Sequence, residues 1–156
     1  MIYSEESTDP RDEYYMQIAL REAWSAFEKD EVPVGAVIVS NGKIIAKGHN
    51  LTETLNDVTA HAEMISLTAA TEALGGKYLP GCTLYVTIEP CIMCAGALGW
   101  SQIGRIVYAA EDSKKGFTKF CSDNLTPLHP RTIVTKGVLA DAAAELMREF
   151  FRKKRR

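Results

Sequence analysis

Apolar residues recur at three- and four-residue steps in four segments of the chain, which is the spacing of one face of a helix. The pattern predicts helices over residues 12–29, 61–74, 91–101 and 140–153. In the first helix, the large side chains of Trp24 and Phe27 are expected in the core. Gly75-Gly76 provides a stop signal for the second helix, and Pro90 stands at a plausible first position of the third.

Short runs rich in valine and isoleucine alternate with these helices. They predict strands over residues 34–40, 43–49, 82–88, 105–110 and, with a weaker pattern, 133–138. Asn41-Gly42 separates the first two runs and predicts a tight hairpin, because both turn positions need positive φ. Strands that alternate with helices predict an α/β fold, here a single mixed sheet of about five strands sandwiched between helices.

A chain of 156 residues is the size of one compact domain. We expect residues 1–11 to be a flexible N-terminal segment and residues 12–156 to form the folded domain. No apolar run reaches the roughly 20 residues that span a membrane, and the acidic start differs from a signal peptide, which begins basic and turns apolar. We therefore expect a cytoplasmic protein without membrane contact, whose four cysteines are reduced and available for metal binding or catalysis.

Charge is unevenly placed along the chain. Residues 148–156 hold six basic residues and one acidic residue, a net charge of +5, so the rest must carry −7 to reach the total of −2. A basic tail on an acidic body indicates a polyanionic partner. The alternative is an ordinary solvated helix end, where basic side chains suit the helix dipole. The tail alone does not separate these two interpretations.

Two short motifs carry the candidate chemistry, HAE at 61–63 and PCIMC at 90–94. Cys91 and Cys94 are three apart, so both thiols share one face of a helix and can reach one ion. A place in the first helical turn lowers the pKa of a thiol and favours the thiolate that zinc needs. His61 would add a neutral nitrogen, and two sulfurs with one nitrogen suit zinc.

Three protein ligands leave a fourth position open, which is typical of a catalytic zinc that lowers the pKa of a water molecule to about 7. Glu63 is the candidate proton carrier, provided that the helix start lets it face the same point as His61. The alternatives are a structural zinc half-site and a redox CxxC pair. Cys82 opens an apolar strand and is a poor fourth ligand, Cys121 lies in a loop and stays possible, and a redox pair leaves HAE unexplained.

The order H-x-E then P-C-x-x-C is the signature of the zinc deaminases that act on nucleobases. Further segments extend the match over nearly the whole chain from about residue 13: PVGAV at 33–37, GHN at 48–50, TAHAEM at 59–64, LYVTIEPCIMCAGAL at 84–98 and IGRIVYAAED at 103–112. In these segments the chain resembles the bacterial tRNA-specific adenosine deaminases of the cytidine deaminase-like superfamily. The resemblance implies a three-layer α/β/α fold, one Zn²⁺ ion per subunit, a homodimer, and a tRNA anticodon stem-loop as partner.

The resemblance also implies a role for each matching residue. His61, Cys91 and Cys94 would be the zinc ligands, and Glu63 would be the proton shuttle. The substrate contacts would be a side chain that hydrogen-bonds the nucleoside, a backbone group at the base edge, two pocket-wall residues and an acid near the flipped nucleotide: Asn50, Ala62, Val34, Ile88 and Asp112, respectively.

The basic tail fits a substrate of this kind. Arg152 and the basic residues after it could neutralise phosphates, and Lys114 could contact the RNA backbone. Phe151 could stack on a base, whereas Phe150 is expected to pack the closing helix onto the core. We therefore expect Lys114, Phe151 and Arg152 among the RNA contacts.

The expected activity is hydrolytic deamination of adenosine to inosine at the first anticodon position of a tRNA. Two alternatives come from other classes. A deaminase of guanine or another free nucleobase or nucleoside would keep the zinc site but would not need the basic tail. A zinc-dependent RNA-binding module without catalysis would keep the tail and the metal but would not need Glu63.

Overall fold

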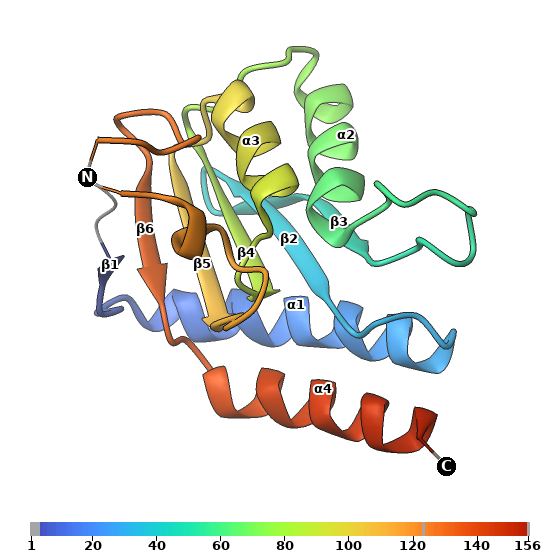
Figure 1. Ribbon diagram of the computed structural model, residues 1–156. Coiled ribbons are helices and arrows are strands. Elements are labelled where there is room, and N and C mark those ends of the chain that lie inside the picture. The colour runs from blue at the N-terminus through green and yellow to red at the C-terminus, as the bar shows by residue number, and fades with distance from the viewer. Residues whose placement is uncertain (1–3, 123, 156) are drawn as a thin grey trace.

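The computed structural model describes residues 4–122 and 124–155, which form one sheet with helices on both faces (Figure 1). Residues 1–3 of the predicted N-terminal segment and Arg156 of the basic tail lie outside the described residues. In the part of the chain that is described, no helix is both long and apolar enough to cross a membrane. The elements in chain order are β1 (Ser4–Glu5), α1 (Pro10–Glu28), β2 (Gly35–Ser40), β3 (Lys43–His49), α2 (Ala62–Leu74), β4 (Cys82–Ile88), α3 (Ile92–Ser101), β5 (Arg105–Ala110), the 3₁₀ helix η1 (Phe117–Phe120), β6 (Ile133–Lys136) and α4 (Ala140–Lys154).

The sheet is mixed, as the sequence predicts, and its strand order is β1-β6-β5-β4-β2-β3. β2 pairs antiparallel with β3 and with β4, whereas the pairs β4–β5, β5–β6 and β1–β6 are parallel. All five predicted strands are present, and the hairpin turn has positive φ at Asn41 (51°) and Gly42 (72°). A sixth strand, β1, has two residues and lies in the predicted N-terminal segment, residues 1–11. It pairs with β6.

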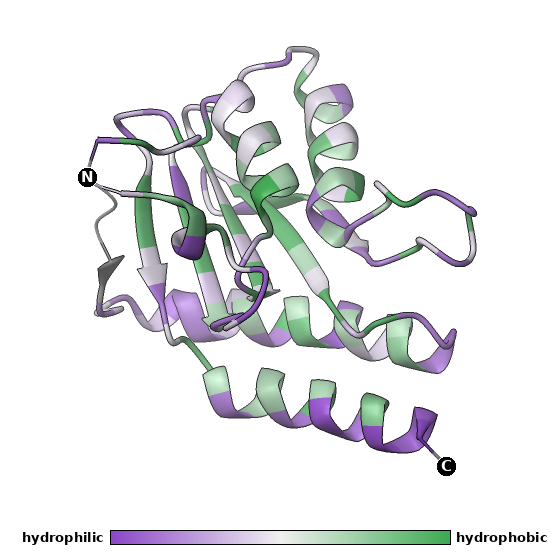
Figure 2. Ribbon diagram, viewed as in Figure 1, coloured by the Kyte–Doolittle hydropathy of each residue, from purple (hydrophilic) through white to green (hydrophobic). Residues whose placement is uncertain are grey.

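Alternate residues of the central strands face opposite sides of the sheet. Ala36 and Ile38 of β2 belong to the core layer under α2 and α3, while Val37 and Val39 belong to the layer under α1 and α4. Figure 2 shows apolar residues along the central strands and a polar outer face on α4. One core layer lies on each face of the sheet, between the sheet and a pair of helices, which confirms the predicted three-layer α/β/α arrangement.

Three helices begin at a different residue from the one predicted. α1 begins two residues earlier, at Pro10, because Asp9 caps its first turn and proline suits the first helical position. α2 and α3 each begin one residue later, with His61 and Cys91 as N-caps in extended conformations. Pro90 therefore precedes the N-cap of α3 and is not its first helical residue. An N-cap side chain is free of the helical periodicity, and this freedom shapes the site described below.

Trp24 is not a core residue, contrary to the sequence prediction, because it is 50% exposed. α1 lies so close to β2 that a Cβ atom at Gly35 would overlap the backbone of Ala19 and Ala23. Only small residues fit where the helix crosses Gly35, at Ala19 and Ala23. The large ring of Trp24 lies at the flank instead, where it packs on Phe27 with the ring centroids 4.8 Å apart.

Asp12 ties α1 to the sheet. Its buried carboxylate accepts two hydrogen bonds of 2.8 Å from the Arg105 guanidinium and one of 2.8 Å from the Tyr85 hydroxyl. Burial alone would raise the pKa of Asp12, but these hydrogen bonds, with one from Ser7, hold that pKa below its usual range. The paired carboxylate therefore fixes α1 against β4 and β5 on the face of the sheet opposite to α2 and α3.

Candidate metal centre and substrate pocket

Two helix N-termini meet on one side of the sheet. α2 and α3 lie side by side there, and each begins next to a residue of a predicted motif (Figure 1). His61 is the N-cap of α2, Cys91 is the N-cap of α3, and Cys94 is the third residue of α3. Neither N-cap side chain makes a capping hydrogen bond to its own helix. Both side chains are thus left to face a common point at the positive ends of two helix dipoles.

The three side chains have the spacing of a zinc site. The Nδ1 atom of His61 lies 3.6 Å from the Sγ atom of Cys91 and 3.5 Å from the Sγ atom of Cys94. A tetrahedral zinc ion with Zn–S of ~2.3 Å and Zn–N of ~2.0 Å separates nitrogen from sulfur by about 3.5 Å. The donor set therefore fits zinc as it stands. Among the described residues, the candidate metal cluster includes neither Cys82 nor Cys121.

The cluster also contains a negatively charged sulfur, which favours the binding of a cation. The pKa of Cys91 falls to about 4 because Cys94 and His61 donate hydrogen bonds to its sulfur. The same contacts raise the pKa of Cys94 and the pKa of His61. One thiolate therefore stands in the cluster at neutral pH, and a metal ion would replace the protons that its neighbours share with it.

Glu63 lies beside the cluster in the first turn of α2 and is only 4% exposed. Because His61 precedes the helix, the two side chains escape the divergence that a spacing of two would impose inside it. Burial raises the pKa of Glu63 to about 7. A carboxyl with such a pKa can accept and return a proton near neutrality, although a bound divalent cation would lower this pKa again.

A pocket of about 440 Å³ opens over the cluster, a size common for small-molecule sites. It is lined by eight residues that the sequence predicts: Val34, Asn50, His61, Ala62, Glu63, Ile88, Cys91 and Asp112. Cys94 completes the cluster from beneath, fully buried. Five further lining residues were not among the predicted site residues: Val32, Thr52, Glu89, Lys115 and Met147.

Asn50 and Asp112 stand in different electrostatic settings in this pocket. The buried Asn50 side chain makes a single hydrogen bond among the described residues, a long one of 3.5 Å from Nδ2 to the Thr52 hydroxyl, so its amide is available to a ligand. One carboxylate oxygen of Asp112 accepts the backbone N–H groups of Lys114 and Lys115, both at 3.0 Å. Asp112 therefore shapes its own loop as well as lining the pocket.

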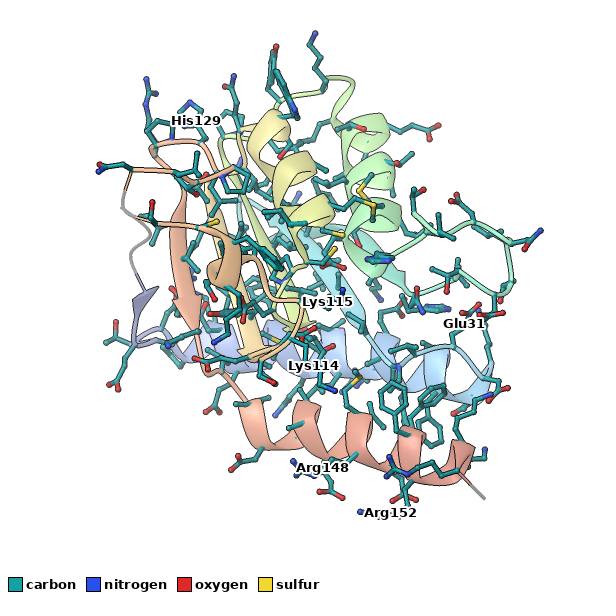
Figure 3. All side chains as sticks on the ribbon, viewed as in Figure 1. Glu31, Lys114, Lys115, His129, Arg148 and Arg152 are labelled. Carbon is teal, nitrogen blue, oxygen red and sulfur yellow. The ribbon has the colours of Figure 1, made fainter. Side chains whose placement is uncertain are left out.

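The three predicted RNA contacts gather outside the pocket rather than in it. Lys114, Phe151 and Arg152 line a neighbouring concavity together with Met147 and Arg148 of α4 and its C-cap residue Arg155. Figure 3 shows Lys114 above α4, and Arg148 and Arg152 along the lower side of this helix. Met147 lines both the pocket and this basic concavity, so the two hollows adjoin.

The two phenylalanines of α4 divide as expected. Phe150 is 4% exposed and packs on Phe27 of α1 with ring centroids 5.8 Å apart, which fixes α4 to the core. Phe151 is 42% exposed and faces the basic concavity.

Known proteins are similar to this chain in both sequence and fold. Residues 9–110 match the family described as the cytidine and deoxycytidylate deaminase zinc-binding region. The chain is 47% identical over 146 residues to the tRNA-specific adenosine deaminase of Agrobacterium fabrum, and the match covers 91% of this chain and 95% of that protein.

Solved structures agree with this relationship. A structure from a study of A-to-I editing by tRNA:A34 deaminases at the wobble position matches with a TM-score of 0.79 at 45% identity, covering 85% of this chain and 98% of that chain. The guanine deaminase from Nitrosomonas europaea matches with a TM-score of 0.75 at 27% identity, covering 95% of this chain and 87% of that chain. The chain therefore belongs to the cytidine and deoxycytidylate deaminase family, and within it to the tRNA-specific adenosine deaminases.

Proposed function

We propose that this protein converts adenosine to inosine at the first anticodon position of a tRNA, with one zinc ion per subunit held by His61, Cys91 and Cys94. The observation that carries the proposal is that one pocket joins this cluster to Glu63 and adjoins a basic concavity. The tRNA-specific adenosine deaminase of Agrobacterium fabrum and the tRNA:A34 deaminase structure support the same substrate.

Each predicted pocket residue has a part in this reaction. Bound zinc supplies a Lewis acid that lowers the pKa of a water molecule to about 7. Glu63 accepts one proton from the water that attacks C6 of adenine and delivers it to the adjacent ring nitrogen. It then accepts the second proton from the hydroxyl now on C6 and gives it to the amino group, which leaves as ammonia when the C6–N bond breaks and the C6 carbonyl forms. The Asn50 side chain hydrogen-bonds the nucleoside, and the Ala62 backbone meets the base edge. Val34 and Ile88 form the apolar wall against which the base packs.

A base can reach this pocket only when it is out of its stack, which an anticodon loop allows at low cost. Asp112 would lie near the backbone of the flipped nucleotide, between the pocket and the basic concavity. Lys114 and Arg152 would neutralise flanking phosphates, and Phe151 would offer a stacking surface.

Removing both basic groups, in a Lys114→Ala, Arg152→Ala double variant, is expected to raise KM for an anticodon stem-loop by about tenfold while kcat changes little. The reason is that phosphate contacts contribute binding but stay remote from the reacting carbon. The dependence of log KM on log salt should also become shallower, by about 0.7 for each lost contact to single-stranded RNA. Kinetics at several salt concentrations would measure both effects.

The matched control is a Lys43→Ala, Lys77→Ala variant, which removes the same charge. Lys43 begins β3 and Lys77 follows the end of α2, so both lie at the opposite ends of these elements from Asn50 and His61. An equal rise of KM in the control would mean that net charge, and not the concavity, sets RNA affinity.

The activity itself is tested by incubating the zinc-loaded protein with an adenosine-first anticodon stem-loop, and in parallel with guanine, cytidine and adenosine. Inosine in the stem-loop alone is the expected result. Xanthine from guanine without inosine in RNA would keep the zinc chemistry but move the protein to the free-base deaminases. Tight RNA binding with no product from any substrate would favour a non-catalytic binding module.

The same proposal includes a homodimer that works in the cytoplasm, where tRNA is decoded. Four exposed apolar side chains on α3 and the loop after β5 support such an interface: Ile92, Trp100, Phe120 and Leu125. Sedimentation equilibrium should then give twice the 17.2 kDa mass of one chain, and a mass of 17.2 kDa would argue against the dimer.

A further inference from the structure

Two buried carboxylates, Glu31 beside the pocket and Glu89 in its lining, have no part in the reaction described above. Glu31 is 0% exposed and Glu89 is 3% exposed. In residues 4–122 and 124–155, neither forms a salt bridge. A buried carboxylate is costly unless hydrogen bonds satisfy it, so their partners show what these residues are for.

Glu31 holds the loop between β3 and α2. One oxygen accepts the backbone N–H of Glu53 at 3.0 Å, and the other accepts both the N–H and the hydroxyl of Thr54 at 2.6 Å each. Figure 3 shows Glu31 between the end of α1 and this loop. Burial would raise the pKa of Glu31, but the hydrogen bonds from the loop lower it below its usual range. The carboxylate therefore stays charged at neutral pH and continues to accept these hydrogen bonds from the loop.

Glu89 holds the loop after β5 in the same way. One oxygen accepts the N–H of Asp112 at 3.1 Å, and the other accepts the N–H and hydroxyl of Thr118 at 3.1 and 2.7 Å. Gly116 lies so close that a Cβ atom there would overlap the carboxylate. Because β4 and β5 are parallel, the segment after β4, which begins with Glu89, and the loop after β5 leave the sheet at the same end. There the Glu89 N–H also donates to the Ala110 carbonyl.

Each loop that is hydrogen-bonded to one of these carboxylates forms one wall of the pocket. The loop from Asn50 to His61 carries a proposed nucleoside contact, the lining residue Thr52 and a metal-cluster residue. The loop from Asp112 to Thr118 carries Asp112 and Lys115, which line the pocket from the other side. Both walls lie outside the strands of the sheet, and the second has one further tie, an isolated bridge between Cys91 and Gly116 in which the Phe117 N–H donates to the Pro90 carbonyl.

We propose that Glu31 and Glu89 are positioning residues that hold these two loops at the spacing that the substrate requires. They form equivalent clamps: in each, a carboxylate accepts two backbone N–H groups and one threonine hydroxyl from the loop it holds. Their loss loosens the walls without removing any group that touches the reacting atoms. The substrate part of this inference rests on the proposed tRNA deaminase function, but the holding of the loops does not.

The test compares Glu31→Gln with Glu89→Gln by hydrogen exchange and by kinetics. Glutamine keeps the shape, but whichever way its amide lies, one acceptor becomes a donor that faces an N–H group. Exchange of residues 51–60 should rise about tenfold in Glu31→Gln, as expected for the loss of one hydrogen bond to a charged group. Exchange of residues 112–118 should rise in Glu89→Gln, and each loop should be unchanged in the other variant.

The kinetic result separates positioning from general stability. KM for the stem-loop should rise about tenfold, with the zinc content unchanged and kcat within about threefold of the parent enzyme. Thr54→Val and Thr118→Val remove one donor each and should give smaller shifts of the same kind, while Thr54→Ser and Thr118→Ser keep the hydroxyl and should behave as the parent. These threonines are exposed, so the variants fold even where a Glu→Gln change does not.

Unchanged exchange in both loops would overturn the proposal, and so would loosened loops with an unchanged KM. If the parent enzyme does not deaminate the stem-loop, the proposed function fails on its own, and the crossed exchange pattern still decides whether the two carboxylates hold the loops.

Discussion

Glu63→Gln is expected to lower the turnover number on the stem-loop by about 10³-fold, within the usual contribution of a positioned general acid–base group. Glutamine has nearly the shape of glutamate but cannot accept a proton and pass it on. The side chain is 4% exposed and lies in the first turn of α2, so water is poorly placed to replace it. Single-turnover inosine formation by the zinc-loaded variant measures the effect.

The matched control for this change is Glu72→Gln, an exposed residue on the same helix that lies outside the pocket. It should leave turnover unaltered. Zinc content is measured on both variants, because a loss of metal in Glu63→Gln would mean that the carboxyl supports the cluster instead of moving protons. Turnover within about tenfold of the parent, with zinc retained, would remove Glu63 from the mechanism, since a proton carrier contributes more than that.

The central strands could be predicted from the sequence because their side chains alternate between two core layers. Val37 and Ile38 are adjacent in the chain, yet each is fully buried, on opposite faces of the sheet. β1 has no such pattern, because Ser4 and Glu5 become a strand only by pairing with Val134 and Thr135 of β6. Long-range pairing of two polar residues leaves no local signal.

The position of Trp24 shows a second limit. The helical period correctly marks α1 as amphipathic, but it ranks large apolar residues as the best candidates for the core. The close approach of Gly35 reverses this ranking locally, because only alanines fit against it, at Ala19 and Ala23. That distance is a property of the packed pair of elements, and the pattern of α1 alone does not contain it.

The metal cluster could be predicted because its chemistry is encoded locally, with two cysteines one helical turn apart and a histidine at the start of another helix. The rest of the pocket is assembled from distant segments. The sequence pattern of α4 predicts only that Met147 faces the core. Met147 lines the pocket because α4 packs next to it, and the sequence of α4 alone does not show this packing. Glu31 and Glu89 could have been suspected as charged residues next to apolar runs, but their partners are set by loop folding.

Cys94→Ser is expected to abolish zinc retention and to lower inosine formation by at least ~10³-fold, since the metal supplies several kcal/mol of transition-state stabilisation. Cys94 is fully buried, and its Sγ lies 3.5 Å from Nδ1 of His61, so no solvent ligand can take its place at the same point. A hydroxyl is a much poorer zinc ligand than a thiolate because it stays protonated at neutral pH. Elemental analysis of the purified variant gives the zinc content per chain.

The control for this variant separates the catalytic zinc site from the structural one that the sequence leaves open. Cys121 lies outside the His61–Cys91–Cys94 cluster in the described part of the chain, so Cys121→Ser should keep one zinc ion per chain and full turnover. Loss of zinc from Cys121→Ser would mean a closed site with four protein ligands, which leaves no position for water. Zinc lost from Cys94→Ser and kept in Cys121→Ser fits only an open site, because three protein ligands then hold the metal and the fourth position remains for the reaction.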